Sequence, residues 1–86
     1  MTTIKLNLNF FTDPGHGWLE VPHTIVRELG LTPTPYSYRN AEFAYLEEDC
    51  DAHAFMEAAK AQGMEVALKV IDEPTSDSFV RSLPRY

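Results

Sequence analysis

Residues 4–11 alternate between apolar and polar side chains as far as Phe10, and this pattern constrains the fold more than any other feature of the chain. A period of two residues is typical of a strand with one buried face, because successive side chains point to opposite sides of a sheet. The apolar members of the pattern are Ile4, Leu6, Leu8 and Phe10. The segment therefore predicts a half-buried strand. The strands that pair with it must come from the remaining residues.

Four further segments have the composition and alternation of strands. They span residues 18–21, 36–39, 43–46 and 64–71. The first of them follows a turn-forming stretch that contains Pro14 and two glycines, so it predicts a hairpin with the N-terminal strand. The last shows alternation again, and we expect it to be central or near-central in the sheet.

Two helices and a short C-terminal turn complete the predicted elements. The first helix is expected over residues 22–29, with Pro22 at its first position and Gly30 as its stop. The second follows the acidic run, with Asp49 or Asp51 as its N-cap and Gly63 as its stop. A short capped helix is expected over residues 76–83, with three apolar side chains packed inward: Phe79, Val80 and Leu83.

This order of elements predicts an α+β fold in a single small domain over residues 1–86. We expect an antiparallel or mixed sheet of about five strands, with two helices on one face and a short C-terminal helical turn. The other face of the sheet would then be open to solvent or to a partner. Its polar residues would be Lys5, Asn7, Asn9, Glu65 and Lys69.

The composition excludes several classes of function. The chain has 13 acidic against 7 basic residues and a formal net charge of −6, which argues against direct binding to nucleic acid. No apolar run approaches the roughly 18–20 residues that span a bilayer, and the first residues lack the apolar core of a signal peptide. One cysteine, Cys50, allows no internal disulfide. We therefore expect a cytoplasmic protein with no membrane association.

No combination of residues predicts catalysis or a cofactor. Cys50 and His53 have a spacing that zinc sites use, and His16 and His23 could complete four ligands, but the two pairs lie in different elements. A nucleophilic role for Cys50 is opposed by the acidic residues around it, because negative charge disfavours a thiolate. We therefore expect no enzyme activity, no metal and no cofactor.

The hairpin turn offers an alternative site. Asp13, His16 and Trp18 lie close together in a glycine-rich stretch, where a carboxylate and an imidazole could hold a small ligand or a metal. The competing interpretation is structural, with Asp13 forming hydrogen bonds inside the turn. A small accessory protein that binds a ligand through residues 13–18 is the second functional hypothesis.

The negative charge of the chain is concentrated in one stretch. Six acidic residues and no lysine or arginine lie between Glu42 and Glu57: Glu42, Glu47, Glu48, Asp49, Asp51 and Glu57. Such a patch would steer the chain to a basic protein surface, and nearby tyrosines are favoured interface anchors. The tyrosines concerned are Tyr36, Tyr38 and Tyr45. The competing interpretation is that the acids favour the helix N-terminus and solubility, with the tyrosines in the core of the sheet.

Three segments resemble a small protein family of phages and other mobile elements: residues 13–21, 36–39 and 45–51. The resemblance covers roughly residues 4–60 and implies no catalytic residues. In size, acidity and lack of catalytic residues the chain is also similar in type to anti-CRISPR proteins. That similarity implies a non-enzymatic inhibitor that covers a nucleic-acid-binding surface of a CRISPR effector complex. Separately, an uncovered edge strand of the sheet could pair two copies, so we expect a monomer or a weak homodimer.

Overall fold

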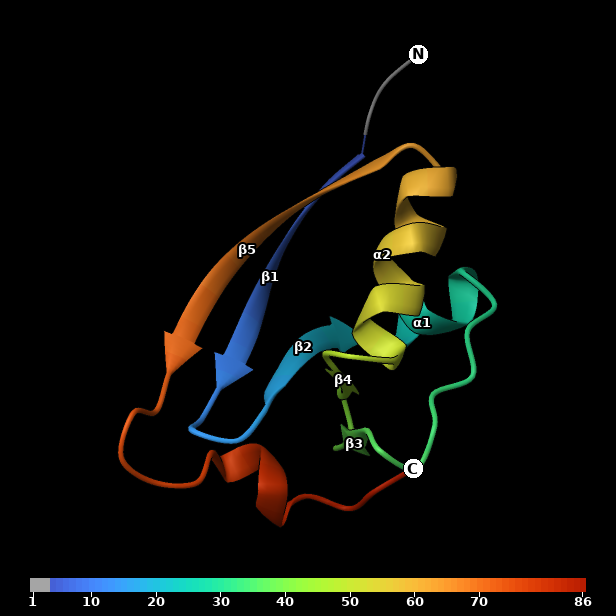
Figure 1. The fold of residues 1–86 in the computed structure, drawn as a ribbon. Coiled ribbons are helices and arrows are strands. Elements are labelled where there is room, and N and C mark those ends of the chain that lie inside the picture. The colour runs from blue at the N-terminus through green and yellow to red at the C-terminus, as the bar shows by residue number, and fades with distance from the viewer. Residues whose placement is uncertain (1–3) are drawn as a thin grey trace.

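The computed structural model describes residues 4–86 and has the predicted α+β architecture, with a five-stranded mixed sheet, two helices and a C-terminal 3-10 turn (Figure 1). The elements are β1 (Ile4–Thr12), β2 (Gly17–Pro22), α1 (His23–Glu28), β3 (Tyr38–Arg39), β4 (Phe43–Glu47), α2 (Asp51–Ala61), β5 (Met64–Asp72) and η1 (Phe79–Ser82). The strand order is β3-β4-β2-β1-β5. The β1–β5 pair is parallel and the other pairs are antiparallel.

The position of β5 differs from the prediction. It was expected to be central or near-central in the sheet, but within residues 4–86 it is an edge strand that pairs with β1 alone, in register from Ile4↔Met64 to Thr12↔Asp72. The connection through α2 carries the chain from β4 past β2 and β1 to this edge. Alternation indicates that one face of a strand is buried, but it does not indicate whether the strand has a paired neighbour on both sides.

Apolar clusters pack against both faces of the sheet. On one face, α1 and α2 pack over the strands, and the buried cluster there includes Leu8, Leu19, Leu46 and Phe55. On the other face, a second cluster of Trp18, Tyr38, Tyr45 and Val80 joins the sheet to the C-terminal segment. The face expected to be open is therefore covered over β2, β3 and β4.

The C-terminal turn is shorter than the predicted helix. Ser78 caps it by accepting a hydrogen bond from the N–H of Val80, as the capped pattern indicates. Val80 is fully buried, but Phe79, which was expected to pack inward, is 49% exposed. The ring of Phe79 lies edge-on to Phe11, with a centroid separation of 5.1 Å. A 3-10 turn places successive side chains on different sides, so Phe79 and Val80 cannot share one buried face.

The helix ends also depart from the prediction. Pro22 is the last residue of β2, where it pairs with Phe43, and it is not the first residue of α1. The N-cap of α2 is Cys50, and no side chain in the described part of the protein caps this helix. Gly30 and Gly63 have φ angles of +69° and +75°, the left-handed conformation expected where the helices stop.

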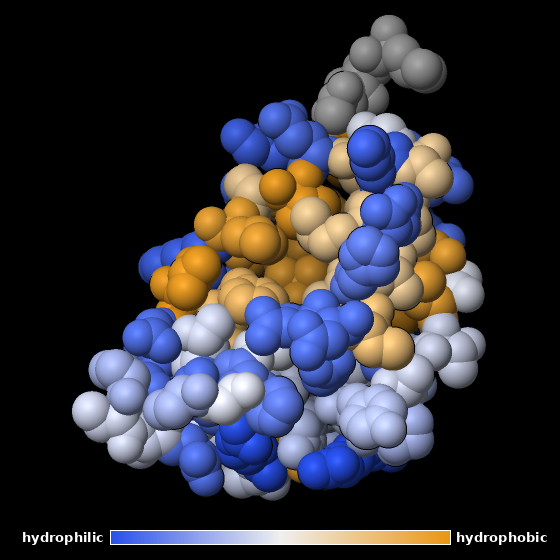
Figure 2. Space-filling model, in the orientation of Figure 1, coloured by the Kyte–Doolittle hydropathy of each residue, from blue (hydrophilic) through white to orange (hydrophobic). Residues whose placement is uncertain are grey.

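On the N-terminal side of Phe10, β1 and β2 diverge, because the pairs between them within residues 4–86 are Phe10↔Leu19, Phe11↔Trp18 and Thr12↔Gly17. The first half of β1 therefore forms a two-stranded ribbon with β5, which extends away from the rest of the sheet (Figure 1). The molecule is correspondingly elongated, at 44 × 23 × 21 Å. Apolar side chains show on the surface between this ribbon and α2 (Figure 2).

Candidate functional site

The hairpin turn between β1 and β2 is organised by Asp13, whose side chain is fully buried. Its backbone N–H donates to the carbonyl of His16 at 2.9 Å. Its Oδ1 atom accepts hydrogen bonds from the backbone N–H groups of Gly15 and His16, both at 3.0 Å. This is the structural role that the turn sequence offered as an alternative.

Asp13 also joins the hairpin to the C-terminal segment. Its Oδ2 atom accepts hydrogen bonds from the backbone N–H of Ser78 at 3.0 Å and from Nε of Arg81 at 2.6 Å. Arg81 also donates through Nη2 to Oδ1 at 2.9 Å. The Arg81 guanidinium and these N–H donors hold the pKa of Asp13 well below its usual range. Both carboxylate oxygens are therefore occupied, and Asp13 is not available to hold a ligand or a metal.

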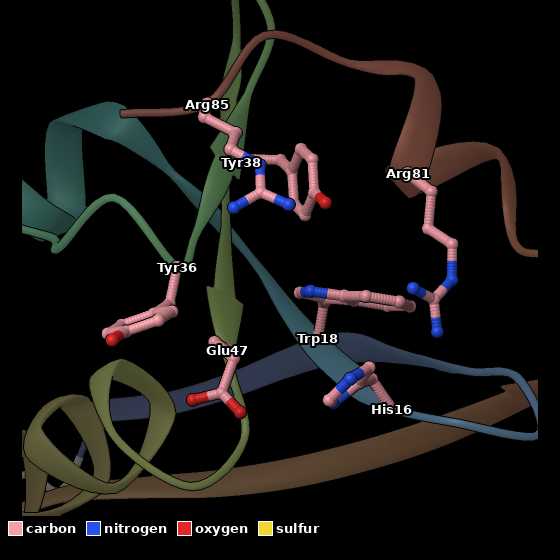
Figure 3. A pocket seen from close by; sticks show the side chains of 7 residues that line it. All are labelled: His16, Trp18, Tyr36, Tyr38, Glu47, Arg81 and Arg85. Carbon is pink, nitrogen blue, oxygen red and sulfur yellow. The ribbon is translucent and has the colours of Figure 1, made fainter.

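Arg81 forms one wall of a cleft of about 110 Å³. The residues that line it are His16, Trp18, Tyr36, Tyr38, Glu47, Arg81 and Arg85 (Figure 3). The two guanidinium groups lie over aromatic rings, with Arg81 5.2 Å from the ring centre of Trp18 and Arg85 5.2 Å from that of Tyr38. The cleft thus combines aromatic walls with groups of both charges.

One buried donor opens into this cleft. Trp18 is 2% exposed, and its indole N–H makes no hydrogen bond with any other residue of the described chain. Within residues 4–86, no fully buried side-chain nitrogen or oxygen lacks a partner, so the indole nitrogen must reach the cleft. Figure 3 shows this nitrogen at the end of the ring nearer to Tyr36 and Glu47, below the guanidinium of Arg85.

The six acidic residues of the 42–57 stretch do not form a single patch. Glu42 lies in the turn before β4, and Glu47 is the last residue of that strand, so β4 separates them. Glu57 is exposed on α2, where its carboxylate lies 4.0 Å from Nε2 of His53. Asp51 is buried, at 7% exposure. Three consecutive acids, Glu47 to Asp49, remain together at the end of β4.

Asp51 has a positioning role that the sequence pattern did not reveal. Its Oδ2 atom accepts hydrogen bonds from the N–H and the hydroxyl of Thr34, both at 2.8 Å, and from the hydroxyl of Ser37. Ser37 in turn accepts a hydrogen bond from the N–H of Glu47 at 3.0 Å. These hydrogen bonds hold residues 34–37, the turn that contains Tyr36, next to the end of β4. The prediction that Asp49 or Asp51 caps α2 is wrong, because neither side chain makes a capping hydrogen bond. The carboxylate of Asp51 joins two other segments instead.

The three tyrosines have different environments. Tyr36 is 67% exposed, whereas Tyr38 and Tyr45 are buried. The hydroxyl of Tyr45 donates to Oε2 of Glu20 at 2.8 Å, and burial together with this carboxylate raises the pKa of Tyr45 to about 12. Of the three, Tyr36 alone is exposed, and Tyr38 and Tyr45 belong to the second core cluster, as the competing interpretation expected.

We use the term acidic corner for Tyr36, Glu47, Glu48 and Asp49. Tyr36 and Glu47 line the cleft, so the corner forms its rim (Figure 3). The ion pairs of residues 4–86 involve Asp13, Asp77 and Glu57, and none of them includes an acid of the corner. Glu47 accepts a hydrogen bond from the N–H of Cys50 at 3.1 Å, which orders its side chain.

The three histidines and Cys50 lie on different elements, except that Cys50 and His53 both belong to the start of α2. In the part of the chain that the structure describes, no three His, Cys, Asp or Glu side chains come together in a way that could hold a metal ion. Nε2 of His23 donates to the carbonyl of Asn40 at 2.8 Å, so its Nδ1 accepts from the hydroxyl of Tyr86 at 3.2 Å. Cys50 is exposed beside the acidic corner.

None of the helices within residues 4–86 is long and apolar enough to cross a membrane. Comparison of the chain with models of protein families, with curated proteins and with solved structures gave no match.

Proposed function

We propose that this protein is a non-enzymatic binding protein whose acidic corner docks on the basic surface of a protein partner. The observation that carries the proposal is the arrangement at the end of β4, where three consecutive carboxylates adjoin the exposed ring of Tyr36 and form no ion pair within residues 4–86. The Asp51 network holds both parts in place before binding. A preorganised surface loses less conformational entropy on binding, which favours affinity.

The electrostatics fit a partner that ordinarily binds nucleic acid. Carboxylates spaced along a corner present negative charge to a groove whose lysines and arginines otherwise hold phosphates. The similarity in type to anti-CRISPR proteins makes a CRISPR effector complex the first partner to test. In that case the protein would act as an inhibitor that covers the nucleic-acid-binding surface of the complex.

The test measures binding of the protein to purified, immobilised CRISPR effector complexes of several types, at low and high salt. The informative variant is Glu48→Lys/Asp49→Lys, because neither side chain makes a hydrogen bond or ion pair within residues 4–86. The matched control is Glu28→Lys/Glu73→Lys, which changes the net charge equally at exposed acids outside the corner.

We expect the corner variant to bind at least roughly tenfold more weakly, since reversing two charges converts attraction into repulsion. The control should bind like the native protein, and added salt should weaken binding because exposed charges are screened beyond about 8 Å. Equal loss of affinity in both variants would mean that net charge alone acts. Native affinity in the corner variant would contradict the proposal.

The cleft favours a second candidate function, the binding of a small carboxylate or phosphate group. The indole N–H of Trp18 opens into it, and Arg85 has no ion-pair partner among residues 4–86. An NMR titration with acetate and with inorganic phosphate would test this, with the indole N–H resonance of Trp18 as the reporter. A saturable shift that Arg85→Met abolishes and Arg27→Met preserves would support it, and an unmoved resonance would exclude it.

A further inference from the structure

The strand β5 presents a long, uncovered edge. It spans nine residues, pairs with β1 on one side and has no neighbouring strand on the other within residues 4–86. Leu68, Val70 and Ile71 are 48%, 61% and 37% exposed. Along such an edge, alternate backbone N–H and C=O groups lack a partner and can pair with another strand. An exposed edge with apolar side chains is a surface that another strand is expected to cover.

The sequence of β5 is chemically symmetrical about Ala67. The residues on either side of it, Val66 and Leu68, are apolar, and the next pair, Glu65 and Lys69, has opposite charges. The outer pair, Met64 and Val70, is again apolar. A strand with this symmetry is complementary to an antiparallel copy of itself.

We propose that β5 is a homodimer interface, in which the β5 strands of two copies pair antiparallel about a twofold axis at Ala67. In this register Glu65 of each copy lies opposite Lys69 of the other, so two ion pairs form on one face of the joined sheet. On the opposite face, Val66 lies against Leu68 and Met64 against Val70. Opposite-charge and apolar cross-strand pairs both stabilise an antiparallel sheet.

Neighbouring registers lack this complementarity. A register centred on Lys69 or on Glu65 places like charges directly opposite each other, which is destabilising. A register centred on Leu68 places Met64 opposite the charged Asp72. A register centred on Val66 forms no ion pair and sets Glu65 against Ala67. The charge pattern therefore selects a second copy of this chain, in one register, as the occupant of the edge.

The geometry of the ribbon supports the same arrangement. The cross-strand pairs Ile4↔Met64, Leu6↔Val66 and Leu8↔Leu68 place apolar side chains on the face that α2 partly covers. A twofold axis perpendicular to the sheet keeps the corresponding faces of both copies on the same side. The apolar surface between ribbon and α2 in Figure 2 would then continue from one copy into the other.

The first test is sedimentation velocity of the native protein over a series of concentrations, together with charge variants of β5. We expect the native protein to form a concentration-dependent dimer. In Lys69→Glu the dissociation constant of this dimer should rise roughly tenfold, because both intermolecular Glu65–Lys69 ion pairs become pairs of carboxylates. The double variant Glu65→Lys/Lys69→Glu exchanges the charges and should restore the dimer. Because Glu65 also lies opposite Lys5 in its own chain, thermal melting of the dilute variants must show that they fold.

The second test fixes the register by disulfide formation in a Cys50→Ser background, which removes the native exposed thiol. Paired Cα atoms in an antiparallel sheet are about 4.5–5.5 Å apart, within the range that a disulfide spans, so Ala67→Cys should form a covalent dimer under mild oxidation. The matched control is Val70→Cys, at a more exposed position that lies far from its own symmetry copy. Equal cross-linking at both positions would overturn the register. A native protein that remains monomeric at every concentration would overturn the proposal.

Discussion

The ion pair between Asp13 and Arg81 joins the hairpin turn to the C-terminal segment, and its removal should destabilise the fold strongly. Asp13→Asn keeps the shape of the side chain but removes its charge and replaces one acceptor oxygen by a donor. The carboxylate accepts hydrogen bonds from Gly15, His16, Ser78 and Arg81, so an amide group leaves at least two donors unsatisfied.

Breaking a buried ion pair by removing one partner costs about 3–5 kcal/mol. The Arg81 side chain is 31% exposed, so water can solvate the guanidinium in part, and we expect the lower end, about 3 kcal/mol. A domain of 86 residues has a free energy of unfolding of roughly 4–13 kcal/mol. At about 4–8 °C per kcal/mol, the variant should melt about 12–24 °C below the native protein.

The pH dependence of this loss has a definite sign. The pKa of Asp13 is lowered in the folded state, so the unfolded chain takes up the proton first as the pH falls. The contribution of the pair is therefore fully present above about pH 5 and decreases progressively as the pH falls below about 4. Urea unfolding of the native protein and Asp13→Asn at several pH values should show a stability difference that is constant near neutrality and shrinks in acid.

The matched control is Asp77→Asn. The Asp77 carboxylate lies 3.8 Å from Nε of the same arginine, but its side chain is 84% exposed, so its removal should change the melting temperature little. Equal melting temperatures for Asp13→Asn and Asp77→Asn would refute the reasoning. A stability difference between native protein and Asp13→Asn that does not change with pH would also contradict it.

Two further predictions concern the residues around the acidic corner and the sheet core. Asp51→Ala leaves the N–H and hydroxyl of Thr34 and the hydroxyl of Ser37 without their acceptor. It should therefore lower the free energy of unfolding in urea titrations by about 2–3 kcal/mol and broaden the NMR signals of Tyr36. Unchanged stability and sharp signals would refute the positioning role of Asp51. The pKa of Tyr45 is raised to about 12 in the folded protein, whereas in the unfolded chain this phenol ionises near pH 10. The unfolded chain therefore loses the proton first, and the free energy of unfolding should fall as the pH rises from about 10. Tyr45→Phe should weaken this loss in alkaline unfolding curves, and an undiminished loss would contradict the assignment.

The fold class follows from local patterns that the sequence displays directly. The alternation of residues 4–11 and the glycines at 30 and 63 mark where a strand forms and where helices end. No local pattern predicts the edge position of β5, because this position depends on which strand β5 pairs with after the connection through α2. Pairing partners are a property of the whole topology, and alternation within one strand does not contain them.

The candidate site was predictable in part for the same reason. The concentration of charge between Glu42 and Glu57 is visible in the sequence, and the structure divides it by the length of β4 and buries Asp51. The partners of Asp51 lie at Thr34 and Ser37, and those of Asp13 at Ser78 and Arg81, which are far away along the chain. Hydrogen bonds between distant segments appear only when the fold brings them together.

The central claim, that the acidic corner covers a basic nucleic-acid-binding surface, is tested most directly by displacement of a labelled nucleic acid. Fluorescence anisotropy would follow a labelled oligonucleotide bound to a purified CRISPR effector complex as the protein is added. We predict that the native protein and Glu28→Lys/Glu73→Lys release the oligonucleotide at the same concentrations, while Glu48→Lys/Asp49→Lys requires at least roughly tenfold more. Displacement that is equal for all three proteins, or no displacement from any complex tested, would contradict the account.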